Sequence, residues 1–165
     1  MSAIAEILET IAHAPVQKRA ITNQNVLNEA YAYAKPSSFS RGMRINLNGI
    51  TILLISGTAS IDESGQSVHI GDFRAQMRRT LANITGLLAS EGCTWHDIVR
   101  TTCYLRDIER DYEAFNEERT AFYKEQGLDP LPASTGIQAI LCRPELLIEI
   151  EAIAMFRTDK KTSEE

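Results

Sequence analysis

The sequence lacks the features that mark several classes of protein. Its 165 residues include only three cysteines, five prolines and one tryptophan. Cys93, Cys103 and Cys142 are odd in number and widely spaced, which indicates reduced thiols rather than a disulfide framework. No run approaches the roughly 18 apolar residues of a membrane-spanning helix, and the N-terminus lacks the cationic start and apolar block of a secretory signal. We therefore expect a cytoplasmic protein without a membrane segment.

Positive charge is also scarce. Lysine and arginine number 17 against 22 acidic residues, which gives a formal net charge of -5, and the two signs are well mixed. We therefore expect no nucleic-acid partner, because no basic face is available for phosphate backbones. The chain has no phosphate-binding loop, dinucleotide fingerprint or nucleophile elbow. His13, His69 and His96 stand without cysteine or carboxylate at ligand spacing, so we expect neither a metal nor another cofactor.

The hydrophobic content of 44% suits a single globular domain with a real core. Residues 1–36 are predicted to form a helical extension, because apolar residues recur at helical spacing over 4–11 and a second helix-prone stretch covers 25–34. Residues 37–157 are predicted to form the domain. The polar tail, residues 158–165, is expected to be disordered.

Local signals give the order of elements within the domain. Asn48 and Gly49 favour a hairpin turn, Asp72 is suited to begin a helix, and Thr94 with Asp97 resembles a capping box. The predicted elements are a hairpin over 45–56, a helix from Asp72 to Gly92, a strand over 98–105, a helix from Asp107 or Asp111 to Gly127, and strands over 133–141 and 146–156. This β-β-α-β-α-β-β order predicts an α+β fold with two helices on one face of a mixed sheet.

The last predicted strand carries two glutamates on one of its faces. Side chains alternate along a strand, so Glu149 and Glu151 share a face. Leu147, Ile153 and Met155 lie on that face, whereas Leu146, Ile148, Ile150, Ala152, Ala154 and Phe156 make the other face purely apolar. A bare buried carboxylate costs several kcal/mol even after relaxation, so these side chains must be paired, solvated or used in chemistry. The strand alone leaves these alternatives open.

Two further features are candidates for a site. The loop over 38–44 holds Arg41 and Arg44 around a glycine, and this arrangement can either bind an anion or remain solvated. Cys142 follows a predicted strand, where a cysteine is usually a small core residue and less often a nucleophile.

From about Ser37 to Phe156 the sequence resembles the Rid superfamily, also called the YjgF or UK114 family. The residues that carry the resemblance are Ser56 to Asp62 (SGTASID), Ala75 Gln76, Thr80 to Ile84 (TLANI), Thr101 to Asp107 (TTCYLRD), Phe115 Asn116, Pro132 Ala133 and Ile148 to Ala152 (IEIEA). The resemblance implies a chorismate-mutase-like fold, assembled as a homotrimer around a central barrel, with a small-molecule cleft at each subunit interface.

The resemblance also implies roles for individual residues. In the deaminase branch an arginine after Pro-Ala binds the substrate carboxylate, and a glutamate fifteen positions later orients the water that hydrolyses an imine. Here the glutamate is Glu149, but the arginine position holds Ser134, and Phe39 replaces an aromatic hydroxyl of the early loop. A hydroxyl cannot supply the bidentate contact of a guanidinium. The chain is therefore expected to be a family member that lacks the deaminase arginine.

A second similarity is to the C-terminal part of chorismatases, which hydrolyse an enol-pyruvyl ether. It rests on Phe39 Ser40 Arg41, the SGTAS run, His69 to Asp72 and Cys142, seven residues before Glu149. In either chemistry Glu149 needs a raised pKa to exchange protons near neutrality.

We expect a homotrimer that binds a small metabolite and possesses either imine, enamine or enol-ether hydrolase activity, or no catalytic activity. Glu149 is the expected catalytic residue. Arg41 is expected to replace the missing cation, and the backbone at Gly57 and Thr135 to stabilise a developing oxyanion. The expected substrate-binding residues are Phe39, Arg41, Gly57, Ser134, Thr135 and Cys142.

Overall fold

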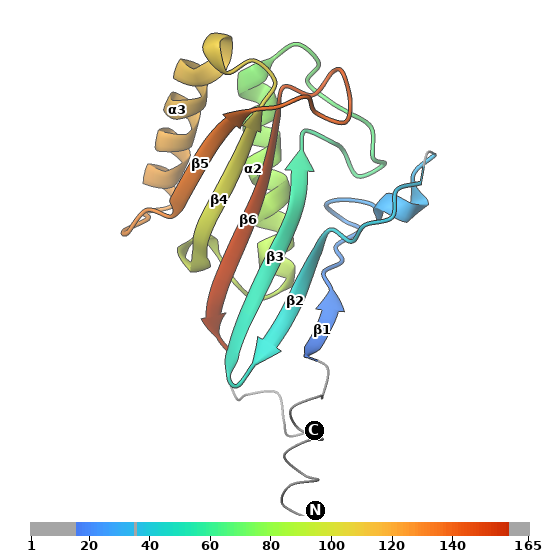
Figure 1. The fold of residues 1–165 in the computed structure, drawn as a ribbon, viewed down its shortest axis with the longest axis vertical. Coiled ribbons are helices and arrows are strands. Elements are labelled where there is room, and N and C mark those ends of the chain that lie inside the picture. Colours follow the sequence, from blue (N-terminus) through green and yellow to red (C-terminus); the bar gives the residue numbers. More distant parts are fainter. Residues whose placement is uncertain (1–15, 35, 159–165) are drawn as a thin grey trace, which may run out of the picture.

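The computed structural model describes residues 16–34 and 36–158 and has an α+β fold. One sheet of six strands is covered by two long helices on one face (Figure 1). The elements are β1 (Gln17–Ala20), the 3-10 turn η1 (Ala30–Ala32), β2 (Gly42–Leu47), β3 (Ile50–Ala59), α2 (Phe73–Ser90), the 3-10 turn η2 (Trp95–Asp97), β4 (Ile98–Leu105), α3 (Ile108–Glu125), β5 (Ala133–Gln138) and β6 (Ile148–Arg157).

The sheet is mixed, as the sequence predicts. Its strand order is β1-β2-β3-β6-β4-β5, in which β4 and β5 run parallel and the other neighbours run antiparallel. From β2 onward the chain follows the predicted β-β-α-β-α-β-β order. The last strand, β6, lies between β3 and β4 near the middle of the sheet (Figure 1). The strand that carries the two glutamates is thus a central one.

The turn and cap residues predicted from the sequence lie at the ends of the observed elements. Asn48 and Gly49 adopt positive φ angles of 46° and 83° in the β2–β3 turn. Asp72 accepts a hydrogen bond from the Ala75 amide at 3.0 Å and begins α2. Thr94 and Asp97 form the predicted capping box around η2. Of the two aspartates considered for α3, Asp107 is the N-cap.

The core lies between the two helices and the sheet. The β6 side chains that face the helices are at most 2% exposed, and they are Ile148, Ile150, Ala152 and Ala154. Trp95 is buried against the edge of Phe122 and donates its Nε1–H to Thr85 Oγ1 at 2.8 Å. On the other face of the sheet Met155 is 42% exposed, so this face is open in the single chain. The predicted alternation of the two faces of β6 is confirmed.

The segment before the domain differs from the predicted helix. Residues 25–34 hold part of a turn closed by the Asn23–Leu27 bridge and the short 3-10 turn η1 instead of a helix, and β1 pairs with β2 as an additional edge strand. Asparagine side chains that compete for backbone groups oppose a helix here: Asn28 Oδ1 accepts from the Glu29 amide, and Asn23 Nδ2 donates to the Gly86 carbonyl. Leu27 is fully buried in the core. Tertiary packing and asparagine chemistry therefore outweigh the helical spacing, and the prediction for 25–34 is wrong.

Other predictions differ only at element ends or fall outside the described residues. β5 ends at Gln138 rather than at residue 141, and β6 begins at Ile148. The predicted helical spacing over 4–11 lies outside the described residues, as does the tail after Thr158. Thr158 itself donates its amide to the Gly49 carbonyl at 2.9 Å.

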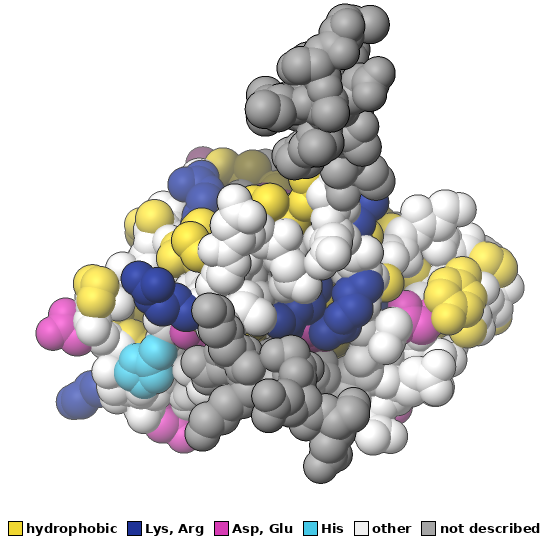
Figure 2. All heavy atoms as spheres, turned by 90° about the horizontal axis from the view of Figure 1, so that it is seen from below, with side chains coloured by type: hydrophobic (Ala, Val, Ile, Leu, Met, Phe, Trp, Pro, Cys, Tyr) yellow, Lys and Arg dark blue, Asp and Glu magenta, His cyan; other side chains and the backbone are white. Residues whose placement is uncertain are grey.

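The surface does not present a membrane-crossing helix among the described residues, because α2 and α3 are too polar over their length. At the end near the β2–β3 turn, side chains of both charges are interspersed with apolar ones over the atoms that the view in Figure 2 leaves uncovered. The three cysteines are free, with Cys93 and Cys103 buried and Cys142 exposed.

Candidate functional site

A cleft of about 790 Å³ lies where β3 and β6 approach the loops that precede β2 and β6. Its walls come from residues 33, 34, 37, 39 and 41, from residues 57, 59 and 61 of and after β3, from the turn 64–66, and from residues 142–146 and 149. These segments are far apart in sequence and meet at the end of the sheet where β3 ends and β6 begins (Figure 1).

Glu149 is one of two glutamates that line this cleft, the other being Glu145. It lies on the open face of β6, opposite Ala59 of β3 and Tyr104 of β4. Burial raises the pKa of the Glu149 carboxyl, and the nearby charge of Glu151 raises it further. Within residues 16–34 and 36–158 no cation forms an ion pair with it; Cys142 Sγ lies 4.0 Å from Oε2. Glu151, by contrast, is exposed.

Gly57 permits the close approach of β3 to this carboxylate. The register between β3 and β6 shifts between Ile55 and Thr58, which brings the Gly57 backbone next to the Glu149 side chain. A Cβ at position 57 would lie 2.0 Å from Glu149 Oε1, closer than any real contact. The glycine of the SGTAS run is therefore required by the position of the carboxylate.

Arg41 is buried rather than solvated, and it lines the same cleft. It is 2% exposed, and its Nε and Nη2 donate to the Asn28 carbonyl at 3.0 and 2.6 Å. Its guanidinium carbon lies 4.9 Å from the ring centre of Tyr33 and 5.3 Å from that of Phe39. Burial lowers the pKa of Arg41, although Glu29 partly offsets this effect.

The structure brings together Phe39, Arg41, Gly57, Cys142 and Glu149, all of which line the cleft. Cys142 is exposed at its edge, so it is not the small core residue that one interpretation of the sequence favoured.

Ser134 and Thr135 lie elsewhere in the single chain. Ser134 Oγ accepts hydrogen bonds from Thr101 Oγ1 at 3.0 Å and from Arg119 Nη1 at 3.1 Å. Thr135 Oγ1 accepts from Arg100 Nη2 at 3.1 Å. Both residues are on the edge strand β5, separated from β6 by β4, and neither lines the cleft.

Tyr33, Gly65 and Arg143 also line the cleft, and the sequence reasoning did not identify them. Gly65 follows Asp62 in a turn and has a φ of +85°, whereas Arg143 precedes Pro144 in the connection before β6. Gly65 and Pro144 are turn signals in the sequence, and such signals indicate only a change of direction. An arginine in a turn next to a candidate catalytic strand is the signal that could have found Arg143.

The comparisons with known proteins identify the family of the chain. The family model described as Endoribonuclease L-PSP matches residues 29–156. The chain belongs to this family, the Rid superfamily. The predicted family resemblance is thereby confirmed.

Among the Rid proteins, the 3-aminoacrylate deaminase RutC of Acinetobacter baylyi is 34% identical over 103 residues, which cover 62% of this chain and 78% of that protein. The Rid family protein YyfA of Yersinia pestis has a solved structure with 28% identity and a TM-score of 0.67, covering 84% of this chain and 98% of that one. The YjgF gene product of E. coli has 27% identity and a TM-score of 0.66, with coverages of 84% and 99%. These neighbours share the fold of two helices on a mixed sheet.

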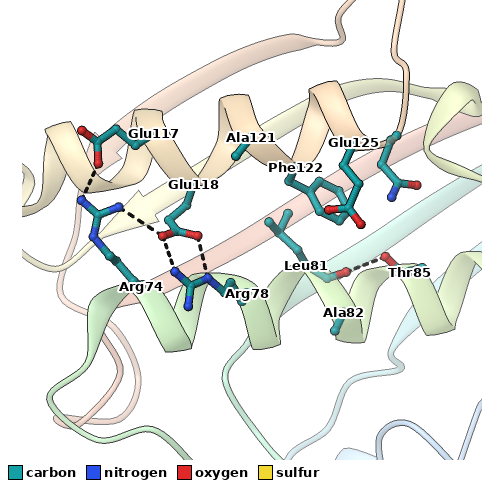
Figure 3. Close-up of a pocket in the computed structure, with 11 residues that line it drawn as sticks. Arg74, Arg78, Leu81, Ala82, Thr85, Glu117, Glu118, Ala121, Phe122 and Glu125 are labelled. Atoms are coloured by element: carbon teal, nitrogen blue, oxygen red, sulfur yellow. Dashed lines mark hydrogen bonds and ion pairs between the residues drawn. The ribbon is translucent and has the colours of Figure 1, made fainter.

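A second hollow of about 710 Å³ lies between α2 and α3 (Figure 3). Glu118 on α3 binds Arg78 at 2.7 and 2.8 Å and Arg74 at 3.1 Å, and Arg74 also pairs with Glu117. These contacts, the hydrogen bonds of Arg78 first among them, lower the pKa of Glu118.

Within the described ranges no three His, Cys, Asp or Glu side chains are grouped so as to hold a metal ion.

Proposed function

We propose that this Rid protein binds a small imine- or enamine-bearing metabolite in the cleft and hydrolyses it with Glu149 as the catalytic acid and base. The observation that carries the proposal is the half-buried Glu149 carboxyl, whose pKa is raised and which forms no ion pair among the described residues. A raised pKa brings a carboxyl closer to the proton affinity that general acid–base catalysis requires.

The reaction needs one group that moves a proton in both directions. Ionised Glu149 accepts a proton from the water that attacks the carbon of the protonated C=N bond, and it then returns this proton to the nitrogen of the tetrahedral intermediate. Glu149 next takes the proton of the intermediate's hydroxyl as the C–N bond breaks, so ammonia leaves, a carbonyl compound remains and the carboxyl ends protonated. An enamine first gains a proton on carbon from protonated Glu149, which yields the same protonated C=N group. The name of the RutC relative, a 3-aminoacrylate deaminase, supports this substrate class.

Assembly as a homotrimer is part of the proposal. The open sheet face exposes 41% of Leu54 and 42% of Met155, an apolar surface that a neighbouring subunit would cover. In such an assembly Ser134 and Thr135 of a neighbour could approach the cleft that they do not reach within one chain. Sedimentation velocity tests this point: we expect a species of three chains, and a monomer at micromolar concentration contradicts it.

The decisive measurement is ammonia release from freshly generated 2-iminobutyrate and 3-aminoacrylate, corrected for their spontaneous hydrolysis. We expect the wild type to accelerate release and Glu149→Gln to lose the acceleration while remaining folded by circular dichroism. Equal rates for these two proteins contradict the proposal.

A non-catalytic ligand-binding module is the second candidate. One observation favours it: Ser134, at the position of the family arginine, is bonded to Thr101 and Arg119 and offers no cation. Ser134→Arg separates the two readings. If only this variant releases ammonia, the wild type is a scaffold without deaminase activity.

The enol-ether alternative is tested with the same proteins by measuring the release of pyruvate from chorismate.

We do not propose endoribonuclease activity, although the family model is described by that name. The net charge of -5 opposes binding to a phosphate backbone. In filter binding at moderate salt we expect no saturable retention of single-stranded RNA.

A further inference from the structure

Arg143 presents an unused pair of hydrogen-bond donors in the wall of the cleft. Its Nη1 donates to the Gly65 carbonyl at 2.8 Å and to Ser67 Oγ at 3.2 Å. Among the described residues, Nε and Nη2 donate no hydrogen bond and the guanidinium forms no ion pair. These two N–H groups lie on one edge of the guanidinium and match the two oxygens of a carboxylate.

In Arg41 the same edge of the guanidinium is already hydrogen-bonded. Its Nε and Nη2 both donate to the Asn28 carbonyl, so only Nη1 is left without a partner in the described part of the chain. In Arg41 the Nε–Nη2 edge is thus occupied and only the Nη1–Nη2 end is open to a ligand, whereas in Arg143 the Nε–Nη2 edge is open. The replacement cation predicted from the sequence is the less suited of the two arginines.

Tyr33 connects the two guanidinium groups. Their carbons lie 4.9 Å (Arg41) and 5.5 Å (Arg143) from its ring centre. Its hydroxyl is buried and has no partner within residues 16–34 and 36–158. The ring packs on Gly65, where a Cβ would lie 2.1 Å from Cε1. Gly65 therefore holds both the ring and, through its carbonyl, Arg143.

The local charges favour an anion at this wall. The charge of Arg143 contributes to lowering the pKa of Arg41, so the two cations are within electrostatic reach. Among the described residues neither Glu145 nor Glu29 forms an ion pair with Arg143: contact with Ser67 is the largest cause that lowers the pKa of Glu145, with smaller contributions from the charges of Arg143 and Arg106, and Glu29 acts on Arg41. Glu29 is 2% exposed, and its Oε1 has no partner among the described residues.

The loop that carries Arg143 is fixed from outside. Arg106 donates through Nε to the Leu146 carbonyl and through Nη2 to the Arg143 carbonyl, both at 2.5 Å. Gln76 of α2, which is fully buried, donates to the Glu145 carbonyl at 2.9 Å. A contact residue on such a support is positioned before a ligand arrives, which lowers the entropy lost on binding.

We infer that Arg143 is the specificity-determining residue of the cleft and receives a ligand carboxylate through Nε and Nη2, with Arg41 Nη1 and the Tyr33 hydroxyl as further donors. This inference rests on the proposed function only in using the same cleft. It assigns the selection of anionic ligands to the 141–146 loop rather than to β5, where Ser134 stands.

The test is calorimetric titration with two matched probes, 2-oxobutyrate and its neutral amide. We expect Arg143→Gln to weaken 2-oxobutyrate binding roughly 10- to 100-fold, the value of charge-assisted hydrogen bonds, and to leave the amide unchanged. Arg143→Lys should recover part of the loss, since it keeps the charge but not the fork. Arg78→Gln is the control, because it removes the same charge from the groove between α2 and α3.

Equal 2-oxobutyrate affinity in the wild type and Arg143→Gln overturns the inference, and so does the absence of saturable 2-oxobutyrate binding to the wild type. An equal loss in Arg78→Gln also overturns it, because the effect would then come from net charge. Glu149→Gln keeps the two proposals apart: it should bind 2-oxobutyrate but lose ammonia release. Turnover retained in that variant sinks the proposed function and leaves the Arg143 comparison standing.

Discussion

The two hollows described above place their carboxylates in opposite electrostatic environments. In the groove between α2 and α3, Glu118 is bound by Arg74 and Arg78 and its pKa is lowered (Figure 3). In the cleft, Glu149 forms no ion pair among the described residues and its pKa is raised by burial. In the groove, Glu117 and Glu118 are already paired with arginines. Chemistry is expected where a carboxylate is held without a counter-ion, and hollowness alone does not locate it.

The largest effect should come from exchanging each carboxyl for its amide. Glu149→Gln removes the group that moves protons, and we expect kcat for ammonia release to fall by about 10²–10⁴. Glu118→Gln should leave kcat unchanged. If Glu118→Gln loses as much activity as Glu149→Gln, the contrast between the groove and the cleft is wrong.

A smaller but sharper effect should follow from filling the space beside Glu149. Gly57→Ala places a Cβ 2.0 Å from Oε1, so the flexible carboxylate end must move while the strand remains. A displacement of about 1 Å can cost roughly 10² in rate, and we expect a loss of up to that size with little change in unfolding midpoint.

The matched control is Gly136→Ala in β5, where the nearest atom to an added Cβ is Phe115 Cε1 at an ordinary 3.9 Å. Steady-state kinetics should separate the two alanines. Similar activity in both variants would mean that the position of the Glu149 carboxylate does not limit turnover.

The pH dependence of stability should have opposite signs at the two sites. Because the folded-state pKa of Glu149 is raised, its ionisation opposes folding: wild-type stability relative to Glu149→Gln should fall as pH rises from the unfolded-state pKa, about 4.3, through the raised value. The lowered pKa of Glu118 stabilises the fold above that unfolded-state pKa, and this contribution is lost as pH falls through the lowered value.

Urea unfolding of the wild type, Glu149→Gln and Glu118→Gln at pH 4 and pH 7, at one protein concentration, measures both differences. Parallel changes in the two variants would show that the contrast between groove and cleft is mistaken.

The smallest effect is expected from Arg78→Gln. Arg78 is 65% exposed, and exposed ion pairs contribute little because water and salt screen them. We expect a shift in Tm within about 2 °C at physiological salt and no change in kcat. A larger loss would mean that the helix pairing depends on this contact.

Much of the fold was predictable because its signals are local. Turn and capping residues act within a few positions, as at Asn48–Gly49, Asp72 and the Thr94–Asp97 box. The alternation of apolar and polar residues along β6 indicates which face is buried. The strand β1 was missed because its sequence, QKRA, has no apolar alternation and is held by pairing and by the ion pair of Arg19 with Glu91 at 2.7 Å. Such a contact joins residues 72 positions apart.

The candidate site was only half visible for the same reason. Glu149 and Gly57 belong to strand motifs, so their places followed from the order of elements. Tyr33 and Arg143 meet through a ring and a guanidinium 110 positions apart in sequence, and their partners include a backbone carbonyl. Backbone carbonyls leave no mark on residue identity, which is why Arg41 was predicted as a free cation although the Asn28 carbonyl occupies its Nε–Nη2 edge.

The manner in which residues 141–146 are held has a consequence for engineering and for divergence among relatives. Arg106 and Gln76 bind the main chain of this loop, so these attachment points do not depend on which side chains it carries, whereas the Arg143 side chain is a further anchor to Gly65. Positions 142 and 145 can therefore be varied as a library while the attachment points stay fixed. Changing what the mouth of the cleft accepts should require no rebuilding of the scaffold beneath it.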